Sequence, residues 1–387
     1  MDVTELLQIR LNNQLLAGHQ LKEPDEVVSW MGAMQAQTLD MAKWGIGVRL
    51  DGHTVRDVES ALNTGRIIRT HILRPTWHFV SADDFHWMRD LSYPQLKPIY
   101  FSYYKTYGVD KEQIYGVIPL LEKSLSGGVH LTKQEIANIL QTEKIATDNH
   151  LLNFAIQLAE IEGILCNGQL RGNTNNTQTF TLLSEWVPRK ETISREEALE
   201  RLARRYFTSH GPATLRDFAW WSGLKITECR QALEMIKPDF VCEKLNDREF
   251  WLCNDNRMLS GSEKSVLPAN NGIALQTNSR SECPANDQSA SFTNSRSALL
   301  LPPFDEFVVS YTDRSEIIED AHYGKVMTKN GLFSPTVMLN GEIVGSWKKI
   351  MKKGIPQIEL SFFQKTPAKV QALFKPEIKR LEQFYSA

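Results

Sequence analysis

The stretch RIIRTHILRPTWHFV, residues 66–80, decides the fold that we predict for this chain. Arg66–Leu73 and Thr76–Val80 are rich in β-branched and aromatic residues, and Arg74-Pro75 separates the two runs. Two such runs around a short break are typical of a hairpin. Helical segments precede this hairpin, and several helices closed by a small hairpin are the outline of a winged helix.

Four helices are predicted ahead of the hairpin, over residues 4–17, 24–34, 39–48 and from 54 onwards. Pro24 stands at the first helical position, where its missing N–H is tolerated. Thr54 precedes its helix, with Asp57 three residues later, which is close to a capping box. After the hairpin, Ser81 begins a further helix. We therefore predict a first winged helix over residues 1–92.

The same order of helices and strands recurs over residues 93–190, which we predict as a second winged helix. Its connector, Tyr93–Tyr107, is crowded with aromatic residues, which either pack between units or form a surface on which bases stack. Its predicted strands, Ile164–Asn167 and Thr179–Leu183, enclose the Gly- and Asn-rich segment GQLRGNTNNTQ, residues 168–178. A polar tip between two strands is typical of a wing.

A third winged helix is predicted over residues 191–253. Within it, Thr227–Ile236 occupies the place of the second helix of a helix-turn-helix pair, the helix that enters the major groove of DNA. Lys225 and Arg230 would then contact backbone phosphates. Helix pairs and hairpins also build purely structural modules, so this pattern by itself leaves the role of the third unit open.

The remainder of the chain divides into two parts. Residues 254–298 are rich in Asn, Ser, Gly and Ala and lack periodicity, which predicts a polar flexible insertion. Within residues 299–387, Ser334–Trp347 alternates around Asn340-Gly341, a strong hairpin signal, and Pro367–Tyr385 is an amphipathic segment. We expect a β-rich C-terminal domain closed by a terminal helix. The predicted fold class is α+β, mainly helical, with tandem winged-helix units ahead of this small domain.

The composition is that of an ordinary globular protein, since 42% of the 387 residues are hydrophobic and 23% are charged. The chain has no apolar run near the ~18 residues of a membrane span and no apolar leader, so we expect a cytoplasmic protein. Five cysteines without a CxxC pair predict neither disulfides nor a zinc site. A net charge of −2 does not indicate nucleic-acid binding, so contact with DNA requires a locally basic face. We also expect no cofactor, no metal and a monomer.

The segment MGAMQAQTLD, residues 31–40, places Gln35 and Gln37 on either side of a small apolar residue, near the predicted end of the second helix. Two glutamines at a helix end are usually no more than solvent-exposed side chains. Here MQAQ is followed by HILRPTWHFVSADDF, residues 71–85, and much later by LLPPFDEFVVSYTDR, residues 300–314. In their order and spacing, the three segments resemble the AlkZ-like, YcaQ-related winged-helix family of DNA glycosylases.

This resemblance covers nearly the whole chain outside the polar insertion. It implies three winged helices in tandem and a β-rich C-terminal part, which together form a concave surface for double-stranded DNA. The family has a Q-x-Q or Q-x-D pair in its first unit as its catalytic signature. By that resemblance, the catalytic pair in this chain would be Gln35 and Gln37, which match the Q-x-Q pattern.

A pair of amides restricts the substrates that such a site can process. Hydrolysis of an N-glycosidic bond passes through an oxocarbenium-like sugar that water attacks. An amide does not take up a proton near neutral pH, but it can hold a water in line through hydrogen bonds. That suffices for purines alkylated at N7 or N3, which are cationic and depart as neutral bases. We therefore expect a monofunctional DNA glycosylase for alkylated purines, with bulky adducts and interstrand crosslinks open as further substrates.

Other side chains in the three segments have expected roles. His78 would orient water or contact a phosphate, although a hydrogen-bonded histidine inside the wing is the simpler explanation. Arg69 and Arg74 would contact phosphates. Three residues of the last segment are expected to hold the C-terminal domain in place through ion pairs: Asp305, Asp313 and Arg314.

Two other classes of protein remain open on the sequence alone. A winged-helix regulator would read DNA sequence without releasing a base, although the chain has no clear dimerisation helix or effector domain. An interaction protein would retain the fold and use it on another partner. Because a fold does not establish an activity, release of N7-methylguanine from a duplex is the observation that separates these alternatives.

Overall fold

The computed structural model describes residues 1–18, 21–145, 149–172, 177–254, 298–352 and 355–386. Apart from its two end residues, the predicted polar insertion lies outside these ranges. Within them the chain is mainly helical, and its strands form small antiparallel sheets. None of the helices in these ranges combines the length and the apolar character that crossing a bilayer requires. The fold is therefore α+β and mainly helical, as predicted.

The first unit contains four helices that pack with one face of a three-stranded sheet. Its helices are α1 (Val3–Asn13), α2 (Pro24–Met31), α3 (Leu39–Gly47) and α4 (Val55–Asn63), and its strands are β1 (Ala33–Gln35), β2 (Ile67–His71) and β3 (Trp77–Ser81). The strand order β1-β3-β2 puts β3 in the centre and β1 at one edge. The predicted capping box is present, because Thr54 and Asp57 bond reciprocally at the start of α4. The predicted hairpin is formed by β2 and β3.

The second helix ends earlier than the sequence pattern suggested. Helix α2 stops at Met31 because Gly32 has a φ of 79°, which helical residues do not adopt. The following residues form β1 and do not continue the helix towards Met34. This correction places Gln35 on a strand, with consequences for the site.

A long helix, α5 (Ala82–Thr106), leads from the first unit to the second. Ser81 caps it, as predicted, by accepting the backbone N–H of Asp84. The helix runs on past Pro94 and Pro98, so it includes the aromatic connector up to Thr106. Its second half buries aromatic side chains against α8, and this burial offsets the hydrogen bonds that the two prolines remove.

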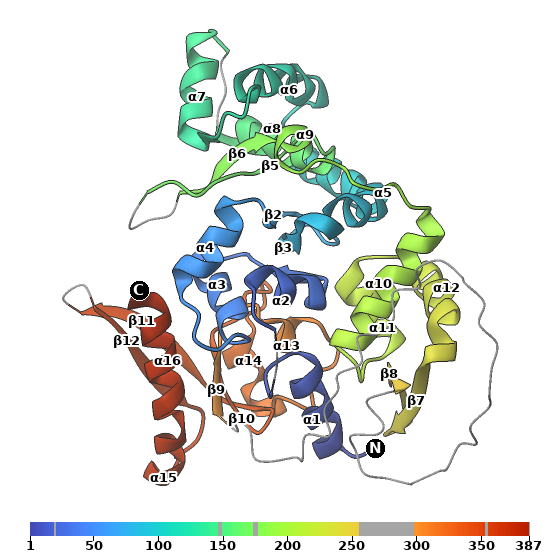
Figure 1. Ribbon diagram of the computed structural model, residues 1–387, viewed down its shortest axis with the longest axis vertical. Coiled ribbons are helices and arrows are strands. Elements are labelled where there is room, and N and C mark those ends of the chain that lie inside the picture. The colour runs from blue at the N-terminus through green and yellow to red at the C-terminus, as the bar shows by residue number, and fades with distance from the viewer. Residues whose placement is uncertain (19–20, 146–148, 173–176, 255–297, 353–354, 387) are drawn as a thin grey trace.

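The second unit packs on that half of α5. Its elements are α6 (Lys111–Leu125), β4 (Leu131–Thr132), α7 (Lys133–Thr142), α8 (Asn149–Ile161), β5 (Leu165–Asn167), β6 (Thr179–Leu182) and α9 (Leu183–Trp186). Tyr100 and Tyr104 of the aromatic connector lie in its core, whereas Tyr103 and Tyr107 are exposed. In Figure 1 this unit, in cyan and green, lies above the first unit.

The third unit packs against the first half of α5. It comprises α10 (Arg195–Ser209), α11 (Leu215–Ser222), α12 (Ile226–Ile236), the 3-10 turn η1 (Lys237–Asp239), β7 (Phe240–Leu245) and β8 (Arg248–Cys253). Gly223, between α11 and α12, has a φ of 69°, and a Cβ there would lie 2.4 Å from the carbonyl oxygen of Leu73. Only glycine allows this approach. The turn between α11 and α12 therefore lies directly on the turn of the β2–β3 hairpin.

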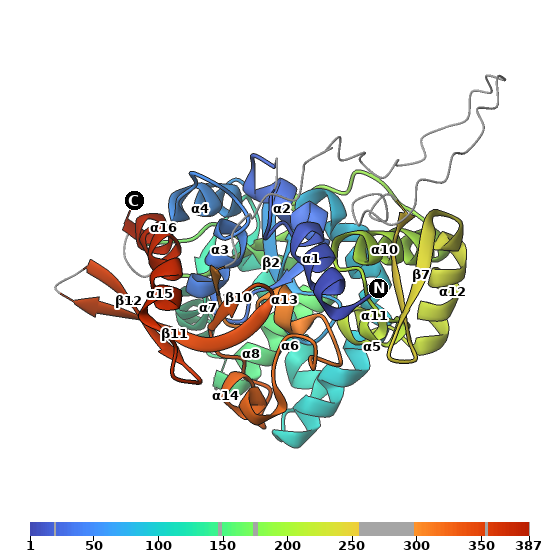
Figure 2. The ribbon, with the colours of Figure 1, turned by 90° about the horizontal axis from the view of Figure 1, so that it is seen from below.

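The C-terminal part is built around a four-stranded sheet of order β12-β11-β10-β9. Its elements are β9 (Ala298–Leu301), α13 (Glu306–Val309), η3 (Asp320–His322), α14 (Tyr323–Val326), β10 (Thr336–Leu339), β11 (Glu342–Lys352), β12 (Ile355–Phe362), α15 (Ala368–Gln371), η4 (Ala372–Phe374) and α16 (Lys375–Ser386). Asn340 and Gly341 have φ values of 53° and 89°, as the predicted two-residue hairpin requires. Figure 2 shows this part, in red and orange, on the side opposite to α12.

The first unit and the C-terminal part share one hydrophobic core. The indole N–H of Trp44 on α3 donates to the carbonyl of Leu300 on β9 at 2.6 Å. Beside it, Arg49 donates to both carboxylate oxygens of Asp305 at 2.8 and 2.9 Å, and both side chains are fully buried. The two ends of the chain are thus joined by apolar packing and by the ion pair expected for Asp305.

The other two predicted anchors are also engaged. Asp313 forms an ion pair with Arg248 on β8 at 2.7 Å, which joins the C-terminal part to the third unit. Arg314 is buried and donates from Nε to the carbonyl of Val308 at 2.6 Å, so among the described residues it is held by a backbone carbonyl and not by the expected ion pair.

Candidate active site

Gln35 and Gln37 lie on one face of an extended segment at the edge of the first sheet. Gln35 pairs with His78 of β3, and the N–H of Ala36 continues the pairing by donating to the carbonyl of Trp77 at 2.6 Å. Side chains two residues apart on a strand point to the same side. Ala36, between them, is buried, whereas Gln35 is half-buried and Gln37 is exposed.

Both glutamine carbonyls are held by hydrogen bonds from the β2–β3 hairpin. Arg74, in the turn, donates from Nη2 to Gln35 Oε1 at 3.2 Å. The backbone N–H of Trp77 donates to Gln37 Oε1 at 2.9 Å. Each carbonyl oxygen keeps a second lone pair. Within the described part of the chain, neither amide NH₂ has a hydrogen-bond partner, so both remain available as donors.

His78 lies across the sheet from Gln35 and is fully buried. Burial, together with the positive charge of Arg74, lowers the pKa of His78 to about 3, so the imidazole is neutral. Its Nδ1 is 2.9 Å from the carbonyl of Thr76, which identifies Nδ1 as the protonated nitrogen. Its Nε2 is a buried acceptor without a hydrogen-bond partner among the described residues.

Arg69 is buried beneath the Q-x-Q segment. It donates from Nε to the carbonyl of Ala36 at 2.9 Å and from Nη1 to Gln178 Oε1 at 3.1 Å. Its guanidinium carbon lies 4.2 Å from the centre of the Trp77 ring. Burial lowers the pKa of Arg69 to about 10, which still leaves it charged at neutral pH. Arg69 therefore supports the segment from below, and Arg74 faces Gln35 directly.

The third unit supplies one wall of the site. Trp220 on α11 lies beside Arg74, with the guanidinium carbon 5.8 Å from the centre of its ring. The indole N–H of Trp220 donates to the carbonyl of Val309 at 2.9 Å, yet 47% of the side chain is exposed. An indole that is fixed at one edge and about half exposed can stack on a base. Lys225, at the N-terminus of α12, and Arg230 on that helix are exposed.

Sequence reasoning missed two residues at this site, Trp220 and Glu306. The backbone N–H of Gln35 donates to Glu306 Oε1 at 2.6 Å, so the start of α13 lies directly behind the pair of glutamines. Glu306 stands in the last of the three family-like segments, which was the available signal. Nothing in that segment distinguished Glu306 from its neighbour Asp305, and nothing in the sequence placed Trp220 near Arg74.

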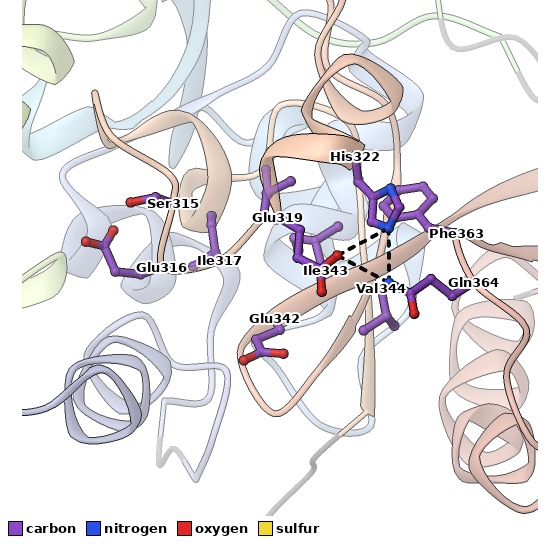
Figure 3. A pocket seen from close by; sticks show the side chains of 11 residues that line it. Ser315, Glu316, Ile317, Glu319, His322, Glu342, Ile343, Val344, Phe363 and Gln364 are labelled. Atoms are coloured by element: carbon purple, nitrogen blue, oxygen red, sulfur yellow. Dashed lines mark hydrogen bonds and ion pairs between the residues drawn. The ribbon is translucent and has the colours of Figure 1, made fainter.

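A cavity of about 230 Å³ lies elsewhere, in the C-terminal part. Figure 3 shows Glu319, His322 and Gln364 pointing towards one another at its edge, with Gln364 Nε2 donating to Glu319 at 3.2 Å. Neither Gln35 nor Gln37 lines it. Among the residues that the structure describes, no three His, Cys, Asp or Glu side chains are arranged to hold a metal ion.

Comparison with known proteins assigns the fold and then the family. The structure is similar to that of the Streptomyces sahachiroi DNA glycosylase AlkZ, with a TM-score of 0.73 over 99% of this chain and 97% of that chain at 17% sequence identity. The chain thus has the fold of a DNA glycosylase. No curated protein sequence matches it. The sequence model described as DNA glycosylase AlkZ-like matches residues 28–384, so the chain belongs to the AlkZ-like DNA glycosylase family. As a member, it is a DNA-binding hydrolase of DNA repair.

Proposed function

We propose that this enzyme hydrolyses the N-glycosidic bond of purines alkylated at N7 or N3 in double-stranded DNA, with Gln35 and Gln37 as its catalytic residues. The observation that carries the proposal is the anchoring of both amide carbonyls by one rigid hairpin, through Arg74 and the Trp77 backbone. Side chains fixed in this way need no reorganisation when the substrate arrives.

The amides position a water molecule and do not deprotonate it. Each amide has one lone pair and two N–H groups left, which is sufficient to orient a water on one side of the sugar. A cationic alkylpurine leaves as a neutral base, so its departure requires no acid. The developing sugar cation is then captured by the oriented water, and the product is an intact abasic site. Bulky adducts and interstrand crosslinks belong to the same chemical class when the alkyl group is on N7 or N3.

His78 takes part in this site as a neutral acceptor. Its Nε2 is directed into the buried region beside Gln35 and carries a lone pair. We assign it the role of packing beside Gln35 on the same face of the sheet, since a fully buried imidazole cannot reach bulk water.

For DNA binding, we propose that the three helix-and-sheet units act as tandem winged helices. The third unit would insert α12 into the groove, with Lys225 and Arg230 on backbone phosphates. The contact of Gly223 with Leu73 brings the start of α12 beside the hairpin turn that carries Arg74. One backbone contact would therefore link groove binding to the hairpin that holds Gln35, and we assign Arg74 to a phosphate that flanks the damaged base. Arg69 would act on the DNA only through Trp77 and the Q-x-Q segment.

The test is base release from a duplex that carries one N7-methylguanine, followed as abasic sites under single-turnover conditions. Gln35→Ala and Gln37→Ala should each lower the rate constant by at least about tenfold and leave the Kd for the duplex nearly unchanged, because positioning a water stabilises the transition state more than the ground state. Gln134→Ala is a matched control, since Gln134 is an exposed glutamine on α7. Full activity in both site variants would refute the assignment, and duplex binding without base release by the wild-type protein would favour a regulator.

A further inference from the structure

Glu306 is a buried carboxylate directly behind Gln35. It lies 271 residues further along the chain, and only 1% of its surface is exposed. Its Oε1 accepts the backbone N–H of Gln35 at 2.6 Å. Its Oε2 accepts the indole N–H of Trp221 on α11 at 3.1 Å and the hydroxyl of Ser310. The first unit, the third unit and the C-terminal part therefore meet at this one side chain.

The carboxylate is anionic although it is buried. Burial alone would raise its pKa, but His210, Ser310 and the positive charge of Arg74 outweigh burial and hold the pKa of Glu306 below its ordinary value. His210 Nε2 lies 3.7 Å from Glu306 Oε2, and burial lowers the pKa of that imidazole. Within the ranges that the structure describes, no lysine or arginine lies within ion-pair distance of Glu306.

The neighbouring Asp305 shows the contrast with a structural carboxylate. Asp305 uses both oxygens to bind the guanidinium of Arg49, which balances its charge. Glu306 instead directs its oxygens to neutral donors, one of which is the backbone of a proposed catalytic residue. A buried carboxylate without a lysine or arginine in contact costs folding free energy, and such groups are concentrated at functional sites.

Two connections run from Glu306 to the Gln35 amide. The first is the hydrogen bond to the Gln35 backbone, which fixes the strand at the point where the side chain leaves it. The second is electrostatic, because Glu306 attracts Arg74, and Arg74 donates to Gln35 Oε1 at 3.2 Å. A misplacement of about 1 Å at a reacting centre can lower a rate by about 100-fold.

We propose that Glu306 is a positioning residue of the glycosylase reaction, which holds the Gln35 amide in line for water through the Gln35 backbone and through Arg74. The proposal rests on the proposed role of Gln35 as a catalytic residue. A glutamine at position 306 cannot replace the carboxylate, since its NH₂ would face either the Gln35 N–H or the donors of Trp221 and Ser310. An aspartate keeps two acceptor oxygens and the negative charge.

The experiment compares Glu306→Gln and Glu306→Asp with the wild-type enzyme on the N7-methylguanine duplex. We expect Glu306→Gln to lower the single-turnover rate constant by about 10- to 100-fold and to leave the Kd for the duplex within about twofold. Glu306→Asp should lose less activity than Glu306→Gln. The matched control is Glu316→Gln, which changes a buried carboxylate ten residues further along the chain whose partner is Arg248 on β8. This variant should keep the wild-type rate within about twofold.

A double variant tests whether Glu306 acts through Gln35. If it does, adding Glu306→Gln to Gln35→Ala should lower the rate by less than about threefold further. A wild-type rate in Glu306→Gln overturns the proposal. A double variant whose loss of rate is the product of the two single losses also overturns it, and so does a Glu306→Gln variant that loses as much duplex affinity as rate. If Glu306→Gln does not melt cooperatively, the same rate is measured for Ser310→Ala, which removes the hydroxyl that donates to Glu306. A rate lowered by at least about threefold at unchanged Kd supports the proposal, and an unchanged rate overturns it.

The outcomes also separate this inference from the proposed function. If the wild-type enzyme releases no N7-methylguanine, the proposed function fails and the role of Glu306 fails with it. If Gln35→Ala is fully active, the role proposed for Gln35 fails, and the role of Glu306 fails with it. If Gln35→Ala is inactive and Glu306→Gln is normal, only the role of Glu306 is wrong.

Discussion

Acidification should destabilise this enzyme in part through His78, the buried histidine opposite Gln35. Burial, together with the charge of Arg74, lowers the pKa of His78 to about 3 in the folded protein. In the unfolded chain the imidazole titrates near its ordinary value of about 6.5. Between these two values the unfolded state binds a proton that the folded state does not bind. The contribution of His78 to stability is therefore fully present above about pH 6.5 and is lost as the pH falls below it.

The magnitude follows from the size of the shift. Each pH unit below about 6.5 costs about 1.4 kcal/mol from this one site, so about 2 kcal/mol is lost at pH 5. His78→Asn is the matched variant, because an asparagine side chain has no group that titrates in this pH range. The asparagine NH₂ can donate to the Thr76 carbonyl, which His78 Nδ1 contacts at 2.9 Å in the wild-type enzyme.

The assay is urea unfolding followed by circular dichroism at pH 7.5 and pH 5. Burial also lowers the pKa of His86, His130 and His210. These three histidines are the same in both proteins, so their contribution to the loss of stability in acid cancels when the two proteins are compared. From pH 7.5 to pH 5, the wild-type enzyme should lose about 2 kcal/mol more unfolding free energy than His78→Asn. Equal losses in the two proteins would refute the reasoning, because they would mean that His78 takes up a proton in the folded state.

Three further predictions concern the core, the site wall and the chemistry. Asp305→Asn should lower the unfolding free energy by about 3–5 kcal/mol, because it leaves the guanidinium of Arg49 buried without its anion. The control Asp313→Asn removes a solvent-exposed pair and should lower the unfolding free energy by less than about 1 kcal/mol in the same urea titration. Trp220→Ala should weaken binding to the damaged duplex by about tenfold, and Trp220→Phe should weaken it less, as measured by fluorescence anisotropy. Equal affinity in the wild-type enzyme and both variants would exclude stacking of a base on Trp220. Uracil and hypoxanthine should be released slower by orders of magnitude than N7-methylguanine, and EDTA should leave the rate unchanged; efficient uracil excision would contradict the mechanism, since uracil departs as an anion.

The parts of the fold that were predicted correctly depend on short-range chemistry. The capping box of Thr54 and Asp57 and the two-residue turn at Asn340-Gly341 need only neighbouring residues to form. The end of α2 was predicted incorrectly, because the apolar spacing continues to Met34 while Gly32 has already left the helical conformation. A single glycine within an apolar pattern leaves this boundary undetermined in the sequence.

For the site too, the sequence predicted the residues that lie close together in the chain and missed those that tertiary packing brings in. The motif placed Gln35 and Gln37 together, and strand geometry then explains why they share one face. Glu306 and Trp220 reach the site only through tertiary packing, across 271 residues in the first case. No local pattern specifies such contacts, because they depend on how the C-terminal part and the third unit close around the first sheet.

The core that the first unit shares with the C-terminal part also governs how this enzyme is made. Arg49 and Asp305 are separated by 256 residues, and a ribosome adds about 5–20 residues per second, so the N-terminal helices wait about 13–50 s for the strand that completes their packing. During that interval the nascent chain exposes the apolar faces of α1 and α3. Glu306 follows Asp305 directly, so the hydrogen bond from the Gln35 backbone to Glu306 forms when β9 and α13 complete the shared core. An interrupted chain therefore contains both glutamines without the Glu306 contact, and we expect a fragment of residues 1–92 to release no base.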